Sequence, residues 1–540
     1  MIKLIKISLI LFLTLINTNV LHSQINKEWT ARYNGPSNNI DDATEIAIDS
    51  KGNIYIAGSS YGSGNNEDYI VIKYSETGVQ KWLALYNGPG NGPDIANAIA
   101  VDDSGNVIVT GGSEGIGSSS DFSTIKYNSL GVQQWEARFT NSGNHRDAAY
   151  AIIIDNSGNI YVTGESFDNI GGRDYLTIKY NSSGDEEWMA RYDGANNEDK
   201  AYAIAIDDSN NIFVSGVSGG DSTTLIDIAT IKYSSLGVQQ WVARYNGPMN
   251  GNDGAFKITT DNEGNVYVCG YTAGAMFYSD YVTLKYNSLG IRKWARIYSG
   301  SGNFLDQARD LVVDKSGNIY VTGYATQSGS GYDFSTIKYN ANGDQLWLVK
   351  YNNGLNDFGN AITIDINENI YITGESDGNG TGYDYATVKY DSSGNQIGVA
   401  RYNYSGQFGD YPSSIAVDSN GSVYVTGSSN RDILTIKYSQ LTGINTLLSG
   451  IPSEFKLYQN HPNPFNPKTN IRYSLIENHF VILKVNDVLG NELKTLVNQK
   501  QNAGSYKVEF NADGLSSGIY FYSLLIDGNI IDTKRMILLK

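Results

Sequence analysis

Three series of aspartates recur along the chain, and their carboxylates are the residues best suited by type and number to bind a ligand or an ion. The second series lies eight residues after the first, from Asp49 to Asp418, and the third series extends from Asp68 to Asp432. Ca²⁺ is bound by several carboxylate and carbonyl oxygens, so a face that gathers these residues could hold a cation or an acidic ligand-binding surface. The first series consists of Asp41, Asp94, Asp147, Asp199, Asp253, Asp306, Asp357 and Asp410.

A structural role explains the same residues. Aspartate at the beginning or end of a strand accepts hydrogen bonds from nearby backbone N–H groups. All three series repeat in every one of eight units, whereas a dedicated site needs one particular set of groups, so the repetition favours the structural role. No segment matches the full calcium loop. We expect no cofactor and no metal, with Ca²⁺ as the alternative, and we keep the first series as the candidate ligand-binding residues.

Residues for nucleophilic or metal catalysis are scarce. The four histidines are His22, His145, His461 and His479, and none of them has the spacing of a metal site. The single cysteine, Cys269, replaces a threonine of the sister units, which predicts a small buried side chain and rules out an internal disulfide. We predict no catalytic residue. Paired carboxylates for glycoside hydrolysis remain an alternative, because acidic residues occur throughout.

The elements that must position these residues are those of a tandem repeat. All seven tryptophans are spaced 53 residues apart, at Trp29, Trp82, Trp135, Trp188, Trp241, Trp294 and Trp347. A rare residue recurs in this way when each copy of a repeat needs it at the same packing position. We therefore expect the tryptophans to pack between neighbouring units rather than to stack on sugars.

Each unit of about 50 residues contains four strand-like segments. In the unit that begins at Asp94 they are residues 94–102, 107–111, 121–127 and 134–139, and the first is expected to be buried on both sides. Four antiparallel strands per repeat predict one blade of a β-propeller. The Ile-Lys-Tyr signature occurs eight times, ending at Tyr438, with a leucine or a valine in place of the isoleucine in two copies.

These patterns predict an all-β, eight-bladed propeller over residues 24–440. The strand around Trp29 would complete the blade formed by residues 410–438 and so close the ring. A local strand from Gly443 is the alternative. The chain resembles the bacterial β-propeller repeat family in its Asp-x-x-Gly-Asn-x-Tyr-Val-Thr-Gly and Tyr-x-Thr-Ile-Lys-Tyr segments, over residues 27–440. That resemblance implies a fold and no single activity.

The N-terminus and the net charge indicate export. Lys3 and Lys6 precede an apolar stretch at residues 7–16, which has the order of a secretory signal peptide covering residues 1–23. No other segment is expected to cross a membrane. The net charge of −17, with no concentrated basic patch, argues against nucleic-acid binding.

The C-terminal part differs from the repeats. Four of the nine prolines fall within residues 452–467, which predicts a linker at residues 441–455 and a small immunoglobulin-like β-sandwich at residues 456–540. These residues resemble the type A sorting domain of the bacterial type IX secretion system. The resemblance rests on motifs that include Asn463, Pro464, Phe465, Asn466, Pro467, Gly490, Gly518, Tyr520, Lys534 and Arg535.

The resemblance implies that the tail is read by the outer-membrane translocon of a Gram-negative bacterium. The protein would then be released or remain on the cell surface. For the propeller we prefer a non-enzymatic module whose loops bind a glycan or a surface protein. The alternatives are a secreted polysaccharide-degrading enzyme with its site at the propeller channel and a purely structural surface protein.

Overall fold

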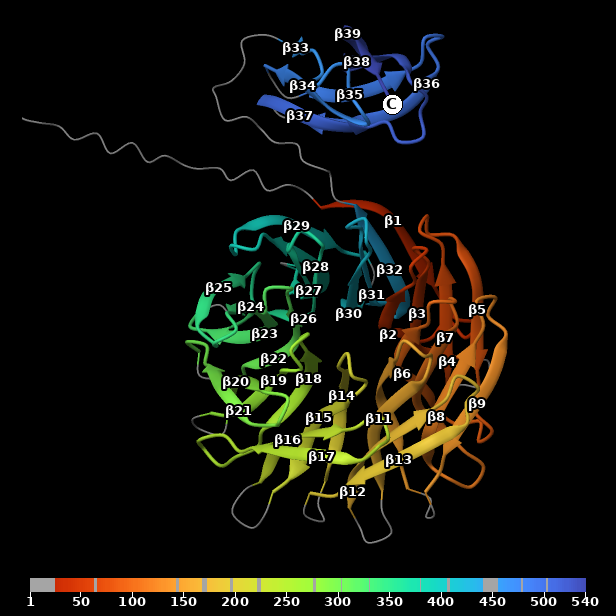
Figure 1. Cartoon of the computed structure of the whole chain (residues 1–540), viewed down its shortest axis with the longest axis vertical. Helices are drawn as coiled ribbons and strands as arrows, with labels where there is room; N and C mark the ends of the chain where they lie inside the picture. The colour runs from red at the N-terminus through yellow and green to blue at the C-terminus, as the bar shows by residue number, and fades with distance from the viewer. Residues whose placement is uncertain are drawn as a thin grey trace, which may run out of the picture. The chain divides into compact units, whose positions relative to one another are not determined.

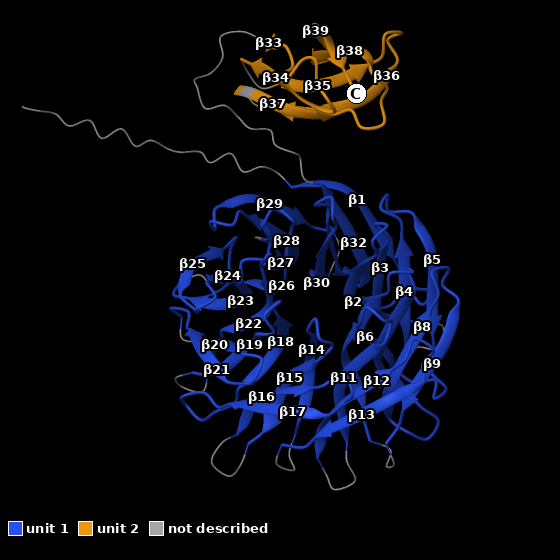
Figure 2. Cartoon of the chain, in the orientation of Figure 1, with its two compact units in different colours: residues 1–439 blue, residues 440–540 orange. Residues whose placement is uncertain are grey.

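The computed structural model describes residues 25–439 and 455–540, apart from 63–65, 142–144, 168–171, 195–197, 221–224, 275–277, 303, 330, 379, 406–407, 477–478 and 502–503. The signal peptide, Gly443 and nearly all of the expected linker therefore lie outside the described residues. The chain forms two compact units, residues 1–439 and 440–540 (Figure 2). The described residues form no helix that is long and apolar enough to cross a membrane.

The first unit is all-β, and its described residues form eight four-stranded antiparallel sheets. Short β-rich segments separated by Gly- and Asn-containing turns favour this arrangement. In each sheet the strand order follows the chain, except that the last sheet has the order β1-β32-β31-β30. Figure 1 shows the sheets arranged around the middle of the unit, with the first strand of each sheet nearest to it.

The first strands are β2 (Asp41–Ile48), β6 (Asp94–Val101), β10 (Ala148–Ile154), β14 (Lys200–Ile206), β18 (Gly254–Thr260), β22 (Gln307–Val313), β26 (Asp357–Ile364) and β30 (Asp410–Val417). The second strands are β3 (Ile54–Tyr61), β7 (Val107–Glu114), β11 (Ile160–Phe167), β15 (Ile212–Gly219), β19 (Val266–Ala273), β23 (Ile319–Gln327), β27 (Ile370–Asp377) and β31 (Val423–Ser429). The third strands are β4 (Glu67–Tyr74), β8 (Ser120–Tyr127), β12 (Arg173–Tyr180), β16 (Ile226–Tyr233), β20 (Ser279–Tyr286), β24 (Gly331–Tyr339), β28 (Tyr383–Tyr390) and β32 (Asp432–Ser439). The fourth strands are β5 (Gln80–Tyr86), β9 (Gln133–Phe139), β13 (Glu186–Tyr192), β17 (Gln239–Tyr245), β21 (Arg292–Tyr298), β25 (Gln345–Tyr351), β29 (Gln396–Tyr402) and, for the last sheet, β1 (Asn26–Tyr33).

The hydrophobic core lies between neighbouring sheets. One cluster joins Tyr55 and Val71 of one sheet to Ile99 and Val109 of the next, and equivalent clusters recur along the unit. The expected packing of the tryptophans is confirmed. Each indole N–H donates to a backbone carbonyl of the next sheet over 3.0 to 3.2 Å, and each ring packs on the turn that contains that carbonyl.

The N-terminal strand β1 belongs to the same sheet as the last three strands of the unit. It pairs with β32 from Asn26 to Tyr33, and the guanidinium of Arg32 lies 2.8 Å from the carboxylate of Asp432. The indole of Trp29 in this sheet donates to the carbonyl of Glu76 in the first sheet. The first strands β30 and β2 pack against each other, as all other consecutive first strands do.

The first strands depart from the expectation that both of their faces are buried. In β6, buried and half-buried residues largely alternate, whereas the second strand β7 is buried along almost its whole length. The first strands differ because of their position, since one face of every first strand lines the middle of the unit, whereas the second and third strands lie inside the sheet and are covered on both faces.

Each first strand carries a β-bulge at its third or fourth residue. In β2 the ladder with β3 passes from Ala43 to Glu45, so Thr44 has no partner, and the same shift occurs in all eight sheets. The residue opposite is always glycine. At Gly58 a Cβ atom would collide with the carbonyl oxygen of Asp42, which explains the glycine of the repeat. A bulge turns its extra side chain in a new direction.

The second unit consists of two sheets that share one core. Its strands are β33 (Lys456–Leu457), β34 (Lys468–Leu475), β35 (His479–Asn486), β36 (Glu492–Gln501), β37 (Gly504–Asn511), β38 (Gly518–Ile526) and β39 (Asn529–Leu538). The sheets have the orders β33-β34-β37 and β36-β35-β38-β39. β33 has only two residues and β36 is largely polar, so neither carries a strong strand signal in the sequence.

Candidate functional site

The first aspartate series lies where the first strands begin, and all eight side chains are at most 1% exposed. Every member accepts a backbone N–H bond of 2.5 to 3.1 Å from the loop that precedes its strand. Burial raises the pKa of each of these carboxyls above its ordinary value. A ligand on this face would meet the loops that the aspartates hold rather than the carboxylates themselves.

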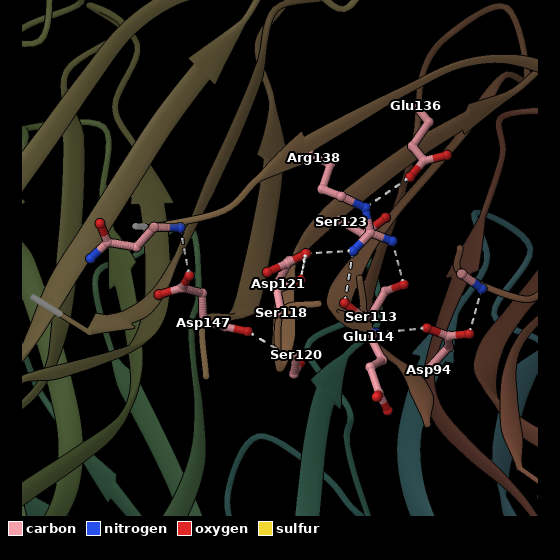
Figure 3. A network of polar contacts seen from close by, with 12 residues as sticks. Asp94, Ser113, Glu114, Ser118, Ser120, Asp121, Ser123, Glu136, Arg138 and Asp147 are labelled. Atoms are coloured by element: carbon pink, nitrogen blue, oxygen red, sulfur yellow. Dashed lines mark hydrogen bonds and ion pairs between the residues drawn. The ribbon is translucent and has the colours of Figure 1, made fainter. Parts of the chain in front are cut away.

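The third series forms a second network at the same end of the sheets. In Figure 3, Arg138 donates to the carboxylate of Asp121 over 2.9 Å and to the hydroxyl of Ser113 over 2.6 Å. Asp94 stands beside this network and accepts the backbone N–H of Glu114 over 3.0 Å. Comparable arginine–aspartate pairs occur in four other sheets, so this network is part of the scaffold.

The second series closes tight turns, as its structural role predicts. Asp49 accepts the backbone N–H groups of Lys51 and Asn53 and the hydroxyl of Tyr55. These hydrogen bonds outweigh the effect of partial burial and lower the pKa of Asp49.

Among the described residues, one group of carboxylates comes close enough to hold a cation together. Oxygens of Asp174, Asp193 and Asp199 lie within 4.8 Å of one another. Three carboxylates are fewer than the six to eight oxygen ligands that Ca²⁺ takes. This cluster by itself does not define a calcium site.

A different set of side chains meets in the middle of the unit. The bulge residues of the eight first strands all line one cavity of about 280 Å³, here called the central cavity. Their identity differs from sheet to sheet, although the residues around them repeat. The bulge residues are Thr44, Asn97, Tyr150, Tyr202, Phe256, Arg309, Asn360 and Ser413.

Small and large bulge residues occupy opposite sides of the central cavity. Thr44, Asn97, Asn360 and Ser413 each donate a hydrogen bond of 2.7 to 2.9 Å to a backbone carbonyl in the next sheet. Ser413 makes this bond to Ala43 and thereby links the last sheet to the first. The other four side chains are bulky. The space around the middle is therefore asymmetric, open beside the small residues and filled beside the large ones.

Charged side chains lie one residue beyond the bulges. The ammonium of Lys257 lies 3.6 Å from the carboxylate of Asp310, and the carboxylate of Glu45 accepts the backbone N–H of Ile99 over 2.8 Å. Burial raises the pKa of Glu45, and the field of Lys257 opposes that rise. The Lys257 side chain nevertheless remains 46% exposed, since it faces the central cavity while protein surrounds it.

A second cavity opens where the first strands begin, and it is here called the mouth cavity. Its volume is about 560 Å³ and its wall includes Asp42, Phe256, Arg309, Asn360, Glu375 and Tyr411. The wall residues come mainly from β26, β27, β30 and β2, beside the small bulge residues. Burial raises the pKa of the Glu375 carboxyl, and the positive charge of Arg309 partly offsets this effect.

Aromatic side chains form a continuous row that reaches the wall of the mouth cavity at Tyr411. Consecutive rings of this aromatic row have centroids 4.9 to 6.1 Å apart. The row crosses three sheets and ends at Tyr411, whose side chain is 44% exposed. The aromatic row consists of Tyr332, Tyr324, Phe358, Tyr383 and Tyr411.

The opposite side of the mouth is ionic. The carboxylate of Glu165 is buried, accepts the hydroxyl of Tyr150 over 2.7 Å, and lies 3.6 to 3.8 Å from three cationic groups. Two of those cations also pair with Glu198. Two carboxylates therefore face three cationic groups, and they offset most of the positive charge but not all of it. The three cations belong to Arg146, Arg173 and Lys200.

The sequence analysis missed both the bulge residues and the aromatic row. The repeat does contain a signal for them. The position after each first-series aspartate is aromatic only at Phe358 and Tyr411 and is otherwise polar, aliphatic or glycine. Variation within an otherwise regular repeat marks the positions that packing does not determine.

The residues of the C-terminal motif hold the last strand of the second unit. Phe465 is buried beside Phe510, and its backbone exchanges hydrogen bonds with Ile537 and Leu539 on either side of the end of β39. The side-chain oxygen of Asn463 accepts the backbone N–H of Ile537 over 2.9 Å. The loop of residues 463–467 thus binds the edge strand β39, which carries Lys534 and Arg535.

The remaining motif residues shape turns and strand ends. Gly490 adopts a φ of 83°, which suits glycine in the turn between β35 and β36. Gly518 begins β38, and the hydroxyl of Tyr520 donates to the carbonyl of Ser516 over 2.7 Å. Pro467 accepts a backbone hydrogen bond from Ala512. The motif residues therefore form turns, strand ends and hydrogen bonds within the fold of the second unit.

Comparison with known families identifies both parts of the chain. The β-propeller repeat family matches residues 28–65, 240–278, 293–328, 352–380 and 396–434. The secretion system C-terminal sorting domain family matches residues 459–539.

Individual relatives are distant. The chain is 24% identical to the uncharacterized WD repeat-containing protein L264 of Acanthamoeba polyphaga mimivirus over 73% of its length, and it spans about a third of that protein (33%). PorZ, a surface component of the type-IX secretion system of Porphyromonas gingivalis, is 14% identical with a TM-score of 0.33, covering 92% of this chain and 81% of PorZ. The WD40 propeller domain of Doa1 is 11% identical with a TM-score of 0.37, covering 77% of this chain and 96% of that domain.

Two findings from the family comparison establish the class of protein. The repeats occur from residue 28 to residue 434, and the sorting domain occupies the C-terminal part. Because this domain directs bacterial proteins through the type IX machinery, the chain is a secreted or outer-membrane surface protein built from β-propeller repeats and ending in a secretion system C-terminal sorting domain.

Proposed function

We propose that the first unit is a closed, eight-bladed β-propeller that binds an external ligand at its mouth cavity without catalysis. The pairing of β1 with β32, the bond from Ser413 to Ala43 and the bond from Trp29 to Glu76 support closure of the ring. Closure leaves no open sheet edge, which suits a protein exposed outside the cell. The tail is proposed to be an immunoglobulin-like sandwich that delivers this propeller to the surface.

The observation that carries the binding proposal is the break in symmetry at the mouth. Packing demands are the same in every blade, so the repeat alone gives no reason for an aromatic row across three sheets and an ionic group across two others. The row lies beside a cavity of about 560 Å³, within the range of small-ligand sites, and Tyr411 is 44% exposed. A purely structural role would leave these positions uniform.

The test is a binding screen with the chain that lacks residues 1–23, against panels of polysaccharides and of surface proteins. The double substitution of Phe358 and Tyr411 by alanine removes part of the aromatic row and should abolish binding of the ligand that the screen identifies. Equal binding by this variant and by the wild type would refute the proposed site.

A hydrolase is the second candidate, because the Glu375 carboxyl has a raised pKa and shares the mouth cavity with Asp42. A carboxyl whose pKa is raised holds its proton to a higher pH, as the general acid of glycoside hydrolysis must. Release of reducing sugar by the wild type, and its loss in Glu375→Gln, would favour this function over simple binding.

A further inference from the structure

The wall of the mouth cavity offers a ligand both hydrogen-bond acceptors and donors. Asp42 and Glu375 contribute carboxylates. Asn360 already donates its amide N–H to the Pro412 carbonyl, and Ser413 donates its hydroxyl to the Ala43 carbonyl. The guanidinium of Arg309 and the hydroxyl of Tyr411 also belong to this wall and can donate to a ligand. A ligand that fits this wall therefore supplies donors to the two carboxylates and can accept hydrogen bonds from Arg309 and Tyr411.

The aromatic row adds flat apolar surfaces to these acceptors. The rings of Phe358 and Tyr383 are 6.1 Å apart, and the rings of Tyr383 and Tyr411 are also 6.1 Å apart. Their planes are inclined by 65° and 51°, so the row is not one flat platform, and Tyr411, which lines the cavity, is the ring that can stack on a flat apolar face of a ligand. A pyranose ring has a C–H face for stacking and a rim of hydroxyl groups that donate hydrogen bonds.

The charges of the chain and of the cavity wall narrow the class of ligand further. The chain has a net charge of −17, and the mouth cavity adds two carboxylates to one guanidinium, that of Arg309. That guanidinium already lies over the ring of Phe256, with 4.7 Å to its centroid. The cations of the opposite side pair with Glu165 and Glu198. An anionic ligand would meet repulsion from Asp42 and Glu375 that Arg309 offsets only in part.

We infer that the mouth cavity takes a neutral glycan, with a sugar ring stacked on Tyr411 and its hydroxyls donating to Asp42, Glu375 and Asn360. This inference rests on the proposed binding function and names its ligand class. The row reaches open solvent at Tyr411, so the glycan can continue beyond the cavity as part of a longer polysaccharide.

The experiment measures binding to the chain without residues 1–23 by titration calorimetry. The probes are neutral hexasaccharides of glucose, mannose, xylose and N-acetylglucosamine, an acidic hexagalacturonate and a cationic glucosamine hexamer. At least one neutral probe should bind more tightly than both charged probes. Tyr411→Ala should weaken that binding about tenfold, because it removes one stacking surface.

Two control variants separate a role in binding from an effect on folding. Tyr411→Phe keeps the ring and should retain the affinity. Tyr404→Ala removes a side chain that is 41% exposed and packs on Arg32 outside the aromatic row, so it should leave binding unchanged.

The possible failures are distinguishable. Preference for a charged probe that still depends on Tyr411 would overturn the neutral-glycan class and leave the proposed binding function standing. If no glycan bound, but a protein from the screen did and Tyr411→Ala weakened its binding, the neutral-glycan class would likewise be wrong and the proposed binding function would stand. If a neutral glycan bound wild type and Tyr411→Ala with equal affinity, both the proposed site and this inference would be wrong.

Discussion

Replacement of Asp94 by alanine tests whether the first aspartate series holds the loops of the unit. The carboxylate of Asp94 is fully buried and accepts two backbone N–H bonds, from Gly88 over 2.6 Å and from Glu114 over 3.0 Å. Alanine offers neither acceptor, so both buried N–H groups would lose their partner.

The magnitude follows from these two bonds and from one opposing effect. Hydrogen bonds to charged groups contribute about 1.5–3 kcal/mol each, which gives about 3–6 kcal/mol for the pair. Burial raises the pKa of Asp94, which means that the protein bears a cost for the ionised form and part of the loss is offset. We expect Asp94→Ala to lower the free energy of unfolding by about 3 kcal/mol.

Calorimetry of the purified chain without residues 1–23 measures this effect. With an unfolding entropy of about 2 cal/mol/K per residue, a unit of this size should lose about 1 °C in Tm per kcal/mol, so the expected shift is about 3 °C. Asp103→Ala is the matched control, since Asp103 lies on an exposed turn at the other end of the same strand. A shift for Asp94→Ala no larger than the control would refute the bracing role and restore Asp94 as a candidate for ligand binding.

Three further predictions follow from the described contacts. The wild type should gain free energy of unfolding relative to Asp94→Asn as the pH falls from 7 toward about 4. The reason is that the raised pKa of Asp94 makes the folded state bind a proton there more tightly than the unfolded state does. Denaturant titrations at several pH values measure this difference, and a difference that does not change with pH would contradict the raised pKa. Trp188→Ala should lower the free energy of unfolding by about 3 kcal/mol, because it removes the packing on Tyr233 and the hydrogen bond to Ser235. Met189→Ala, at a site that is 38% exposed, should change the free energy of unfolding little in the same titrations. Deletion of residues 455–540 should leave the first unit in the periplasm, as fractionation and immunoblotting would reveal, and normal surface delivery would disprove the role of the tail.

The strands of the repeat were predictable because each strand carries its own local signal. The unit that begins at Asp94 forms strands within a few residues of the expected bounds, and its tryptophan packs on the next sheet as expected. Turn residues such as Gly105 and Asn106 mark the ends of strands, and the constant spacing of Trp82 and Trp135 sets the length of the unit.

The bulges were not predictable from any single strand. A bulge is a property of two paired strands, and the pattern of β2 alone does not show that Thr44 lacks a partner. The glycine of β3 was visible as a repeat feature, but its cause, the approach of the Asp42 carbonyl, exists only in the paired sheet. The sequence analysis therefore placed the candidate site on the residues that repeat most regularly, the first aspartate series, and these are buried.

The contrast between the first aspartate series and the bulge residues indicates which positions can give specificity to a protein made of near-identical units. Asp94 and its counterparts recur because every loop needs the same brace, and a residue required eight times for packing has little freedom to serve one ligand. The bulge position is free of that constraint, since its side chain leaves the ladder and enters the middle of the unit. Thr44 and Phe256 occupy equivalent places and differ in size and chemistry. A repeat scaffold thus acquires an asymmetric site by variation at positions that its regular packing leaves free, of which the bulge is one.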